Sequence, residues 1–375
     1  MERKRRKKKS FGQVLLRLML IGAAVVVLVG GGYYGIKKLI LSQEHQFNVT
    51  KILIPKKGML DQGSARTCWA YTGLAMIEAE LLRTGKGEFD LSEGYITYYN
   101  SLDRCQYGIN NPDEKWNLGG CLADVWETIK KHGIVPDSLM RYPDDRKYNL
   151  LRTEISGDDG LVAQAGWAVG KDDKEGEKMC KTNIQVAHNR CFNEPPAMIA
   201  INGDSVTPQQ YWESMGLDIN DYIQVTSVTG VPYGKECVMT YPDHWRKVPT
   251  LNVELDKMME LVDKSIEMGY TVAWDGDISE KSFAWHFQNG FARLFGKKER
   301  WVSPSVRQKA IDKKKTWDDH TMLICGTAVD ENGDVYYVMK NSWGKLLPNG
   351  GMLMMSRAYL RYKTIMLTFH KDVLK

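Results

Sequence analysis

The order of the apolar patterns along the chain constrains its fold more than any other sequence feature. Helical patterns come first, over residues 69–84 and 122–132. Two apolar runs come last, at 321–329 and 334–340, and Asn332-Gly333 in the connection between them is typical of a β-hairpin turn. Helices followed by antiparallel strands predict an α+β fold rather than an alternating βαβ fold.

The N-terminus carries a second strong pattern. Seven of the first nine residues are Lys or Arg, and residues 18–36 contain no charge. A helix of that length spans about 28 Å, close to the roughly 30 Å of a bilayer core. Lys37 and Lys38 follow the apolar run, so the excess of positive charge predicts a cytoplasmic N-terminus and an exported body. A cleaved signal peptide is the alternative for this segment.

Charge and composition narrow the function. The net charge of +5 comes from the basic run, and the rest of the chain is slightly acidic. A nucleic-acid-binding domain would carry its positive surface on the folded body, so we expect no nucleic-acid partner. The patterns divide the chain into a basic tail (1–10), a membrane anchor (11–38), a linker (39–50), and a folded body (51–375) with an insertion at about 141–220.

Cys68 is the candidate nucleophile. It would open the helix predicted at 69–84, where the partial positive charge of a helix N-terminus favours the thiolate and lowers the thiol pKa. Gln62 precedes it on the loop that leads into the helix. The Gln62 side-chain amide and the Cys68 backbone N–H could together form an oxyanion hole.

His320 and Asn341 are the candidate partners of that thiol. His320 precedes the first strand of the hairpin and Asn341 follows the second, so the hairpin can bring them side by side. The Asn carbonyl oxygen could then fix the imidazole tautomer and leave the other ring nitrogen to the thiol. Trp343 could cover this pair. Gly119 and Gly120 leave backbone groups open to an extended peptide.

Each of these features has a simpler interpretation. A lone Cys is usually a small buried apolar residue, a lone His is usually structural, and paired glycines usually mark a loop. The chain has no C-x-x-C and no H-E-x-x-H motif, so we expect neither a metal nor a cofactor. If the body is exported, Cys180 and Cys191 could form a disulfide.

The motifs resemble those of a known family. Residues 62–69 (QGSARTCW) are similar to the catalytic loop of papain-like cysteine peptidases, and 319–320 and 341–344 resemble the two remaining catalytic segments in the same order. Residues 89–95 (FDLSEGY) and 131–136 (KHGIVP) point to the bleomycin hydrolase and aminopeptidase C group within that family.

The resemblance implies a two-lobed papain-like fold, thiol peptidase activity and a peptide or protein substrate. It also implies the site residues: nucleophile Cys68, base His320, orienter Asn341, oxyanion donor Gln62, substrate-backbone contacts Gly119 and Gly120, and supporting Trp69 and Trp343.

The chain also departs from the resembled group. The insertion at 141–220 is too short for the one that builds a hexamer, so we expect no hexamer. The group's C-terminal arm, which restricts cleavage to free N-termini, would be absent after Lys375. These departures favour an open cleft and leave endopeptidase and aminopeptidase activity both open. A catalytically silent peptide-binding module and a transamidase with the same thioester chemistry remain alternatives.

Overall fold

The computed structural model describes residues 46–54, 59–114, 117–201, 203–296, 298–344 and 349–375. Residues Phe47–Lys375 form one compact unit with a helical lobe and a β lobe. The predicted tail and anchor, residues 1–38, lie outside the described residues. Among the residues that the structure does describe, no helix is long and apolar enough to cross a bilayer.

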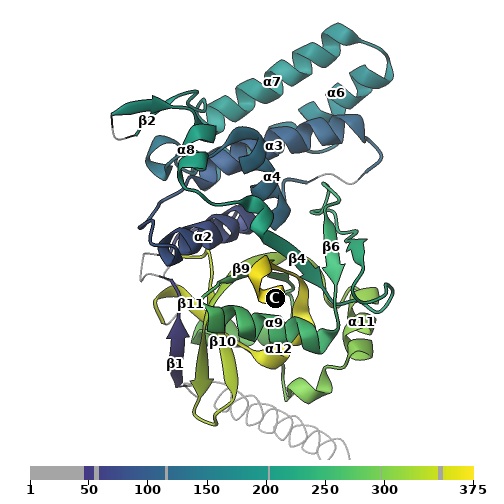
Figure 1. Ribbon diagram of the computed structural model, residues 1–375. Coiled ribbons are helices and arrows are strands. Elements are labelled where there is room, and N and C mark those ends of the chain that lie inside the picture. Colours follow the sequence, from purple (N-terminus) through teal and green to yellow (C-terminus); the bar gives the residue numbers. More distant parts are fainter. Residues whose placement is uncertain (1–45, 55–58, 115–116, 202, 297, 345–348) are drawn as a thin grey trace, which may run out of the picture. The chain divides into compact units, whose positions relative to one another are not determined.

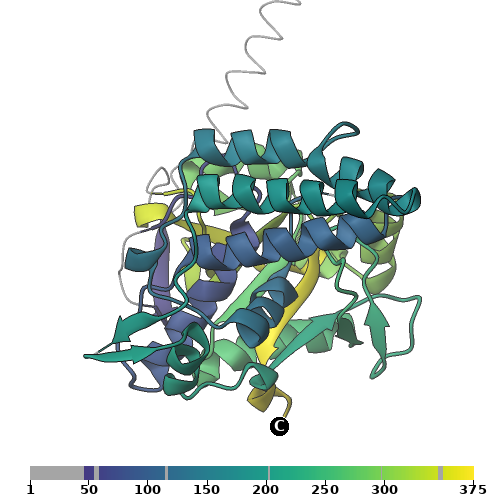
Figure 2. The ribbon, with the colours of Figure 1, turned by 90° about the horizontal axis from the view of Figure 1, so that it is seen from above.

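The helical lobe is built from the first part of this unit. Figure 1 shows α2 next to the sheet and the other helices stacked on it, and Figure 2 shows α3, α6 and α7 running alongside one another. The helices are α2 (Cys68–Arg83), α3 (Glu93–Asn110), α4 (Leu122–His132), α5 (Asp145–Ile155), α6 (Leu161–Gly170), α7 (Lys174–Phe192) and α8 (Pro208–Ser214).

The β lobe holds one large sheet and four helices. Its strands are β1 (Phe47–Ile52), β4 (Tyr222–Thr226), β5 (Glu236–Val238), β6 (Pro249–Asn252), β7 (Val272–Gly276), β8 (Phe291–Ala292), β9 (His320–Asp330), β10 (Val335–Lys340), β11 (Met352–Ser356) and β12 (Thr364–His370). Its helices are α9 (Leu255–Met268), α10 (Lys281–His286), α11 (Pro304–Asp312) and α12 (Arg357–Lys363), and a separate small hairpin is formed by β2 (Ile199–Ile201) and β3 (Asp204–Val206).

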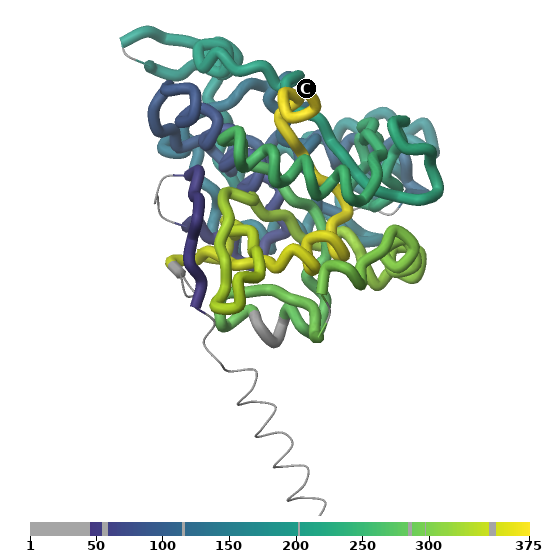
Figure 3. Tube along the Cα trace, turned by 60° about the horizontal axis from the view of Figure 1, so that its bottom comes forward, coloured from purple at the N-terminus to yellow at the C-terminus, as the bar shows by residue number. Residues whose placement is uncertain are grey.

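Strand order in the large sheet brings distant parts of the chain together. The order is β5-β6-β4-β12-β7-β9-β10-β11-β8, with β1 also pairing β9. Strand β12 therefore lies between β4 and β7, antiparallel to both. Figure 3 shows β1, from the start of the unit, alongside the β9–β10 hairpin.

Apolar side chains cover both faces of this sheet. Successive residues of a strand point to opposite faces. On β9, Leu323 and Cys325 pack toward α2, whereas Met322 and Ile324 pack into a second core under α9 and α12. The central strands β7, β9 and β12 are therefore buried on both faces.

The main sequence predictions of structure are confirmed. The helix predicted at 69–84 is α2, and the hairpin strands predicted at 321–329 and 334–340 are β9 and β10. Helix α4 begins and ends as predicted, and Gly133 follows it at φ 75°. A Cβ there would lie 2.3 Å from the Pro208 carbonyl carbon, so only glycine fits.

Two regions differ from the sequence predictions. The weakly periodic residues 141–220 contain four helices, α5 to α8, rather than an irregular surface excursion. The end of the predicted linker at 39–50 belongs to strand β1, because Phe47 to Ile52 pair with β9.

Cys180 and Cys191 lie on the same helix, α7, and both are free thiols, so the predicted disulfide is absent from the described chain.

Candidate active site

The loop before α2 is joined to the loop after β10. The Gln62 backbone N–H donates to the Ser342 carbonyl at 2.8 Å, and the Gly344 N–H donates to the Leu60 carbonyl at 2.9 Å. An antiparallel bridge between Asp61 and Trp343 lies between these two bonds. The segment that carries Gln62 and the segment that follows Asn341 are therefore held together by backbone hydrogen bonds.

His320 and Asn341 form the pair that their places in the hairpin predict. His320 is the first residue of β9, Asn341 follows β10, and both are buried. His320 Nε2 lies 2.9 Å from Asn341 Oδ1. Because a carbonyl oxygen only accepts, Nε2 carries the proton and Nδ1 is left as an acceptor. Trp343 stacks on the imidazole, with ring centroids 4.6 Å apart.

Cys68 is the first residue of α2 and is half-buried. Burial raises the pKa of its thiol to about 12, against the lowering effect of hydrogen bonds with Thr321, and the carboxylates of Asp275 and Asp318 raise it further. Burial also lowers the pKa of His320 to about 4, against the raising effect of the Asn341 hydrogen bond. The direction of the shift is therefore opposite to the depression of the Cys68 pKa expected from the helix terminus, because desolvation outweighs the helix dipole.

Gln62 is buried, and two hydrogen bonds hold its side-chain amide in place. Its Nε2 donates to the Ala65 carbonyl at 2.5 Å, and its Oε1 accepts from Ser342 Oγ at 2.5 Å. An amide nitrogen has two hydrogens, so one N–H is left for an oxyanion. The two bonds fix the orientation of the amide before any substrate arrives.

Gly119 and Gly120 are buried in close contacts. The Gly119 N–H donates to Asn117 Oδ1 at 2.7 Å. A Cβ on Gly119 would lie 2.6 Å from the Asp243 carboxylate, and a Cβ on Gly120 would lie 2.9 Å from the Trp69 indole. The predicted substrate-backbone site is therefore covered on one side by Asp243.

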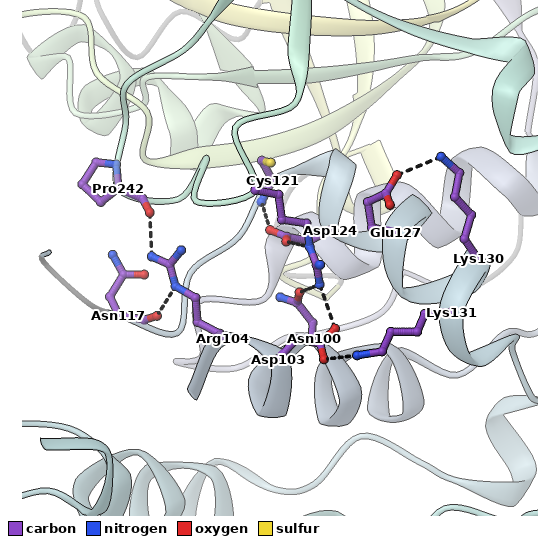
Figure 4. Close-up of polar contacts among 11 residues, drawn as sticks. Asn100, Asp103, Arg104, Asn117, Cys121, Asp124, Glu127, Lys130, Lys131 and Pro242 are labelled. Carbon is purple, nitrogen blue, oxygen red and sulfur yellow. Dashed lines mark hydrogen bonds and ion pairs between the residues drawn. The ribbon is translucent and has the colours of Figure 1, made fainter. Parts of the chain in front are cut away.

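Asp243 belongs to a segment that the sequence patterns did not single out. We call residues 239–247 the cleft segment. Arg104 of α3 donates to the carbonyl of Pro242, in the cleft segment, at 2.6 Å and to the Asn117 carbonyl at 3.1 Å. Figure 4 shows Arg104 between these two carbonyls. These contacts fasten the cleft segment to the loop that carries Gly119.

Arg246 makes the second attachment of the cleft segment to the helical lobe. It bonds Asp124 of α4 at 2.7 Å, and on α3 it bonds Asn100 at 2.9 Å and Asp103 at 3.2 Å. Asp124 in turn accepts from the Cys121 N–H at 2.9 Å (Figure 4). The first turn of α4 and the cleft segment are therefore held in one network of charge-assisted hydrogen bonds.

His244 attaches the same segment to the β lobe. Its Nε2 lies 2.9 Å from Asp318 and 3.7 Å from Asp275. Burial opposes the charged imidazole, but the two carboxylates outweigh it and raise the pKa of His244 to about 10. Burial and the Asp318 charge raise the pKa of Asp275 well above its usual range. Asp318 lies two residues before His320 in the sequence. No sequence pattern indicates that it pairs with His244.

Comparisons with known proteins agree with this geometry. Residues 200–375 match the family model described as "Peptidase C1-like family". Aminopeptidase C of Listeria monocytogenes is 24% identical, over 84% of this chain and 80% of that protein. Aminopeptidase C of Lactobacillus helveticus is 22% identical, over 84% and 79% respectively. Cysteine proteinase 1, mitochondrial, of Saccharomyces cerevisiae is 21% identical, over 86% and 76%.

A solved structure shows the same fold. The crystal structure of PepW from Lactobacillus rhamnosis superposes with a TM-score of 0.71 at 16% identity, covering 98% of this chain and 93% of that one. The chain therefore has the α+β papain-like fold. Residues 200–375 match the Peptidase C1-like family model, and the chain is distantly homologous to aminopeptidase C over most of its length.

Proposed function

We propose that this papain-like cysteine peptidase hydrolyses peptide bonds through a thioester on Cys68, with His320 as the base and Asn341 as the residue that orients it. The observation that carries the proposal is the 2.9 Å bond from His320 Nε2 to Asn341. It leaves Nδ1 as the proton acceptor at the start of β9, and the next residue, Thr321, contacts the Cys68 thiol.

The acceptor left on His320 defines the first step. The Cys68 thiol gives its proton to His320 Nδ1 while its sulfur attacks the peptide carbonyl carbon. The carbonyl oxygen becomes an oxyanion, which accepts from the Cys68 backbone N–H and from the remaining N–H of Gln62. The imidazolium then donates its proton to the leaving amine. Water, activated by the neutral imidazole, hydrolyses the thioester and restores the thiol.

The position of the cleft segment favours aminopeptidase activity, in which residues are removed from a free N-terminus. Asp243 packs against Gly119, where an extended substrate would continue away from Cys68. Its Oδ1 has no hydrogen-bond partner, and its carboxylate is mostly buried. A substrate ammonium would give Oδ1 the hydrogen-bond donor it lacks, whereas a longer chain would collide with the segment. The printed name of several relatives, aminopeptidase C, agrees with this specificity.

Paired peptides test both parts of the proposal. The full chain is incubated with peptides that differ only in N-terminal acetylation, and the products are sequenced. We expect stepwise loss of single residues from the free peptides and little cleavage of the acetylated ones. Cys68→Ala should remove both activities. Internal cleavage of acetylated peptides would leave the thiol chemistry intact and refute the role of the cleft segment.

Asp243→Asn separates the carboxylate from the segment that carries it. The variant keeps the shape of the side chain and removes its charge. It should raise KM for free peptides while kcat changes less, because binding of the ammonium precedes the chemistry. Glu236→Gln, an exposed carboxylate on β5, is the matched control and should leave both constants unchanged. An unchanged KM in Asp243→Asn would contradict recognition of the amine.

A further inference from the structure

We propose that His244, Asp275 and Asp318 form a binding site for a divalent cation of the zinc class. One ligand atom from each residue can be chosen so that all lie within 4.8 Å of one another. An imidazole nitrogen and two carboxylate oxygens are ligands that zinc accepts, and three protein ligands leave a fourth position for water. The residues come from the cleft segment, from β7 and from the loop before β9.

The distances suit a tetrahedral ion. Zinc bonds to nitrogen and oxygen are about 2.0–2.2 Å long, so neighbouring ligand atoms are roughly 3.4 Å apart. His244 Nε2 is 2.9 Å from Asp318 Oδ2 and 3.7 Å from Asp275 Oδ2. These two separations lie on either side of the expected value. Shifts of a few tenths of an ångström would therefore complete the geometry.

The polar atoms of this cluster lack ordinary partners. Neither carboxylate oxygen of Asp275 has a hydrogen-bond partner, although that side chain is only 1% exposed. His244 Nε2 also makes no aligned hydrogen bond, despite its 2.9 Å approach to Asp318. These atoms approach one another as ion pairs without aligned hydrogen bonds, so their lone pairs are available to a bound cation.

The charges also favour a cation. Once zinc has displaced the protons of the cluster, two ionised carboxylates and a neutral imidazole carry a charge of about −2, which a single Zn²⁺ neutralises. Mg²⁺ and Ca²⁺ prefer all-oxygen ligand sets, so the imidazole selects against them.

Metal at this site would join the two lobes. His244 belongs to the cleft segment, which Arg104 and Arg246 fasten to α3 and α4, whereas Asp275 belongs to the β sheet. Coordination would add Asp275 to the existing link between His244 and Asp318 and hold Asp243 over Gly119. The absence of C-x-x-C and H-E-x-x-H excludes local zinc motifs but not ligands that the fold brings together.

Zinc titration of a variant that lacks the Cys68 thiol tests the site. Full-length Cys68→Ala is used, because a cysteine thiolate and His320 could bind zinc themselves. The chain is stripped with a chelator, and ZnCl₂ is titrated in competition with a chromogenic chelator. We expect one zinc per chain and a higher melting temperature with zinc than with chelator. No bound zinc, or no rise in melting temperature, would overturn the proposal.

Ligand variants in the same Cys68→Ala background locate the ion. Loss of an outer-shell partner alone weakens metal binding by roughly 10–100-fold, so His244→Gln and Asp275→Asn should each weaken it by at least that much. Asp319→Asn is the matched control, since this neighbouring carboxyl accepts from the Ile278 N–H at 2.8 Å and is not in the cluster. Circular dichroism in chelator checks that each variant is folded.

Two results of the variant series decide the assignment. Loss of binding in folded His244→Gln, with binding kept in Asp319→Asn, supports the site even if Asp275→Asn fails to fold. Equal zinc affinity in the parent and in both ligand variants shows that zinc binds elsewhere and overturns the proposal.

Discussion

Replacement of Asn341 by alanine tests the orienting role most directly. The Asn341 Oδ1 accepts from His320 Nε2 at 2.9 Å and from the Ser342 N–H at 2.8 Å, and all three residues are buried. Asn341→Ala leaves both donors without a partner. Each orphaned buried donor costs about 1–3 kcal/mol, so the free energy of unfolding should fall by about 2–6 kcal/mol.

The same change lowers the rate of catalysis. If the His320 bond contributes about 1–3 kcal/mol to holding the productive tautomer, its loss lowers kcat/KM by roughly 5–150-fold. The assay is hydrolysis of a fluorogenic aminoacyl amide, with urea unfolding of the same preparations. Asn220→Ala, an exposed position in the helical lobe, is the control and should match the parent in both measurements.

Asn341→Asp provides the complementary test. Aspartate keeps the acceptor and adds a negative charge beside the imidazole, so it should raise the His320 pKa above its value of about 4. A base is lost below its own pKa, so the acid limb of kcat/KM should move to higher pH. An Asn341→Ala variant within twofold of the parent rate, or an unmoved acid limb in Asn341→Asp, would refute the orienting role.

Four further predictions concern other parts of the chain. Iodoacetamide should label Cys68 before the six other thiols, because His320 can accept its proton during attack and five of the six others are buried, and prior labelling should abolish turnover; mass spectrometry of the labelled peptides decides this. Gly119→Ala should raise KM, because its Cβ would lie 2.6 Å from the Asp243 carboxylate, and a wild-type KM would show that the contact is unimportant. Burial lowers the pKa of His188 from 6.5 to about 4. The stability that the neutral imidazole contributes should therefore be complete above pH 6.5 and should decline by about 3 kcal/mol as the pH falls to 4. Equal acid sensitivity of His188→Gln and the parent in urea unfolding would count against this. If residues 18–36 form the predicted anchor, the protein should stay in the membrane fraction after alkaline washing, and release into the wash would contradict it.

Local patterns were sufficient to predict the frame of the site. Helix α2 and the β9–β10 hairpin follow from apolar periodicity and from the Asn-Gly turn, which act over a few residues. These elements place Cys68 at a helix start and His320 beside Asn341, and the structure brings the last two within hydrogen-bond distance. Helix α3 was not predicted from periodicity, because Tyr, Asn and Ser are distributed through it and most of them are buried.

The electrostatics of the site could not be predicted from local patterns. The helix terminus at Cys68 indicates a lowered pKa, but burial between the lobes reverses the direction. The cleft segment likewise shows no periodicity, and its Asp243 and His244 contact residues far away in the sequence. Only the folded chain determines such contacts, because desolvation and charge pairing arise from packing rather than from neighbours in sequence.

The central position of β12 determines when the large sheet can be completed during synthesis. Cys68 emerges from the ribosome early, whereas residues 364–370 emerge after almost all the rest of the described chain. Until β12 is made, β4 and β7 have no strand between them, and the two halves of the sheet remain separate. The sheet can therefore be completed only when the last strand of the described chain has been made.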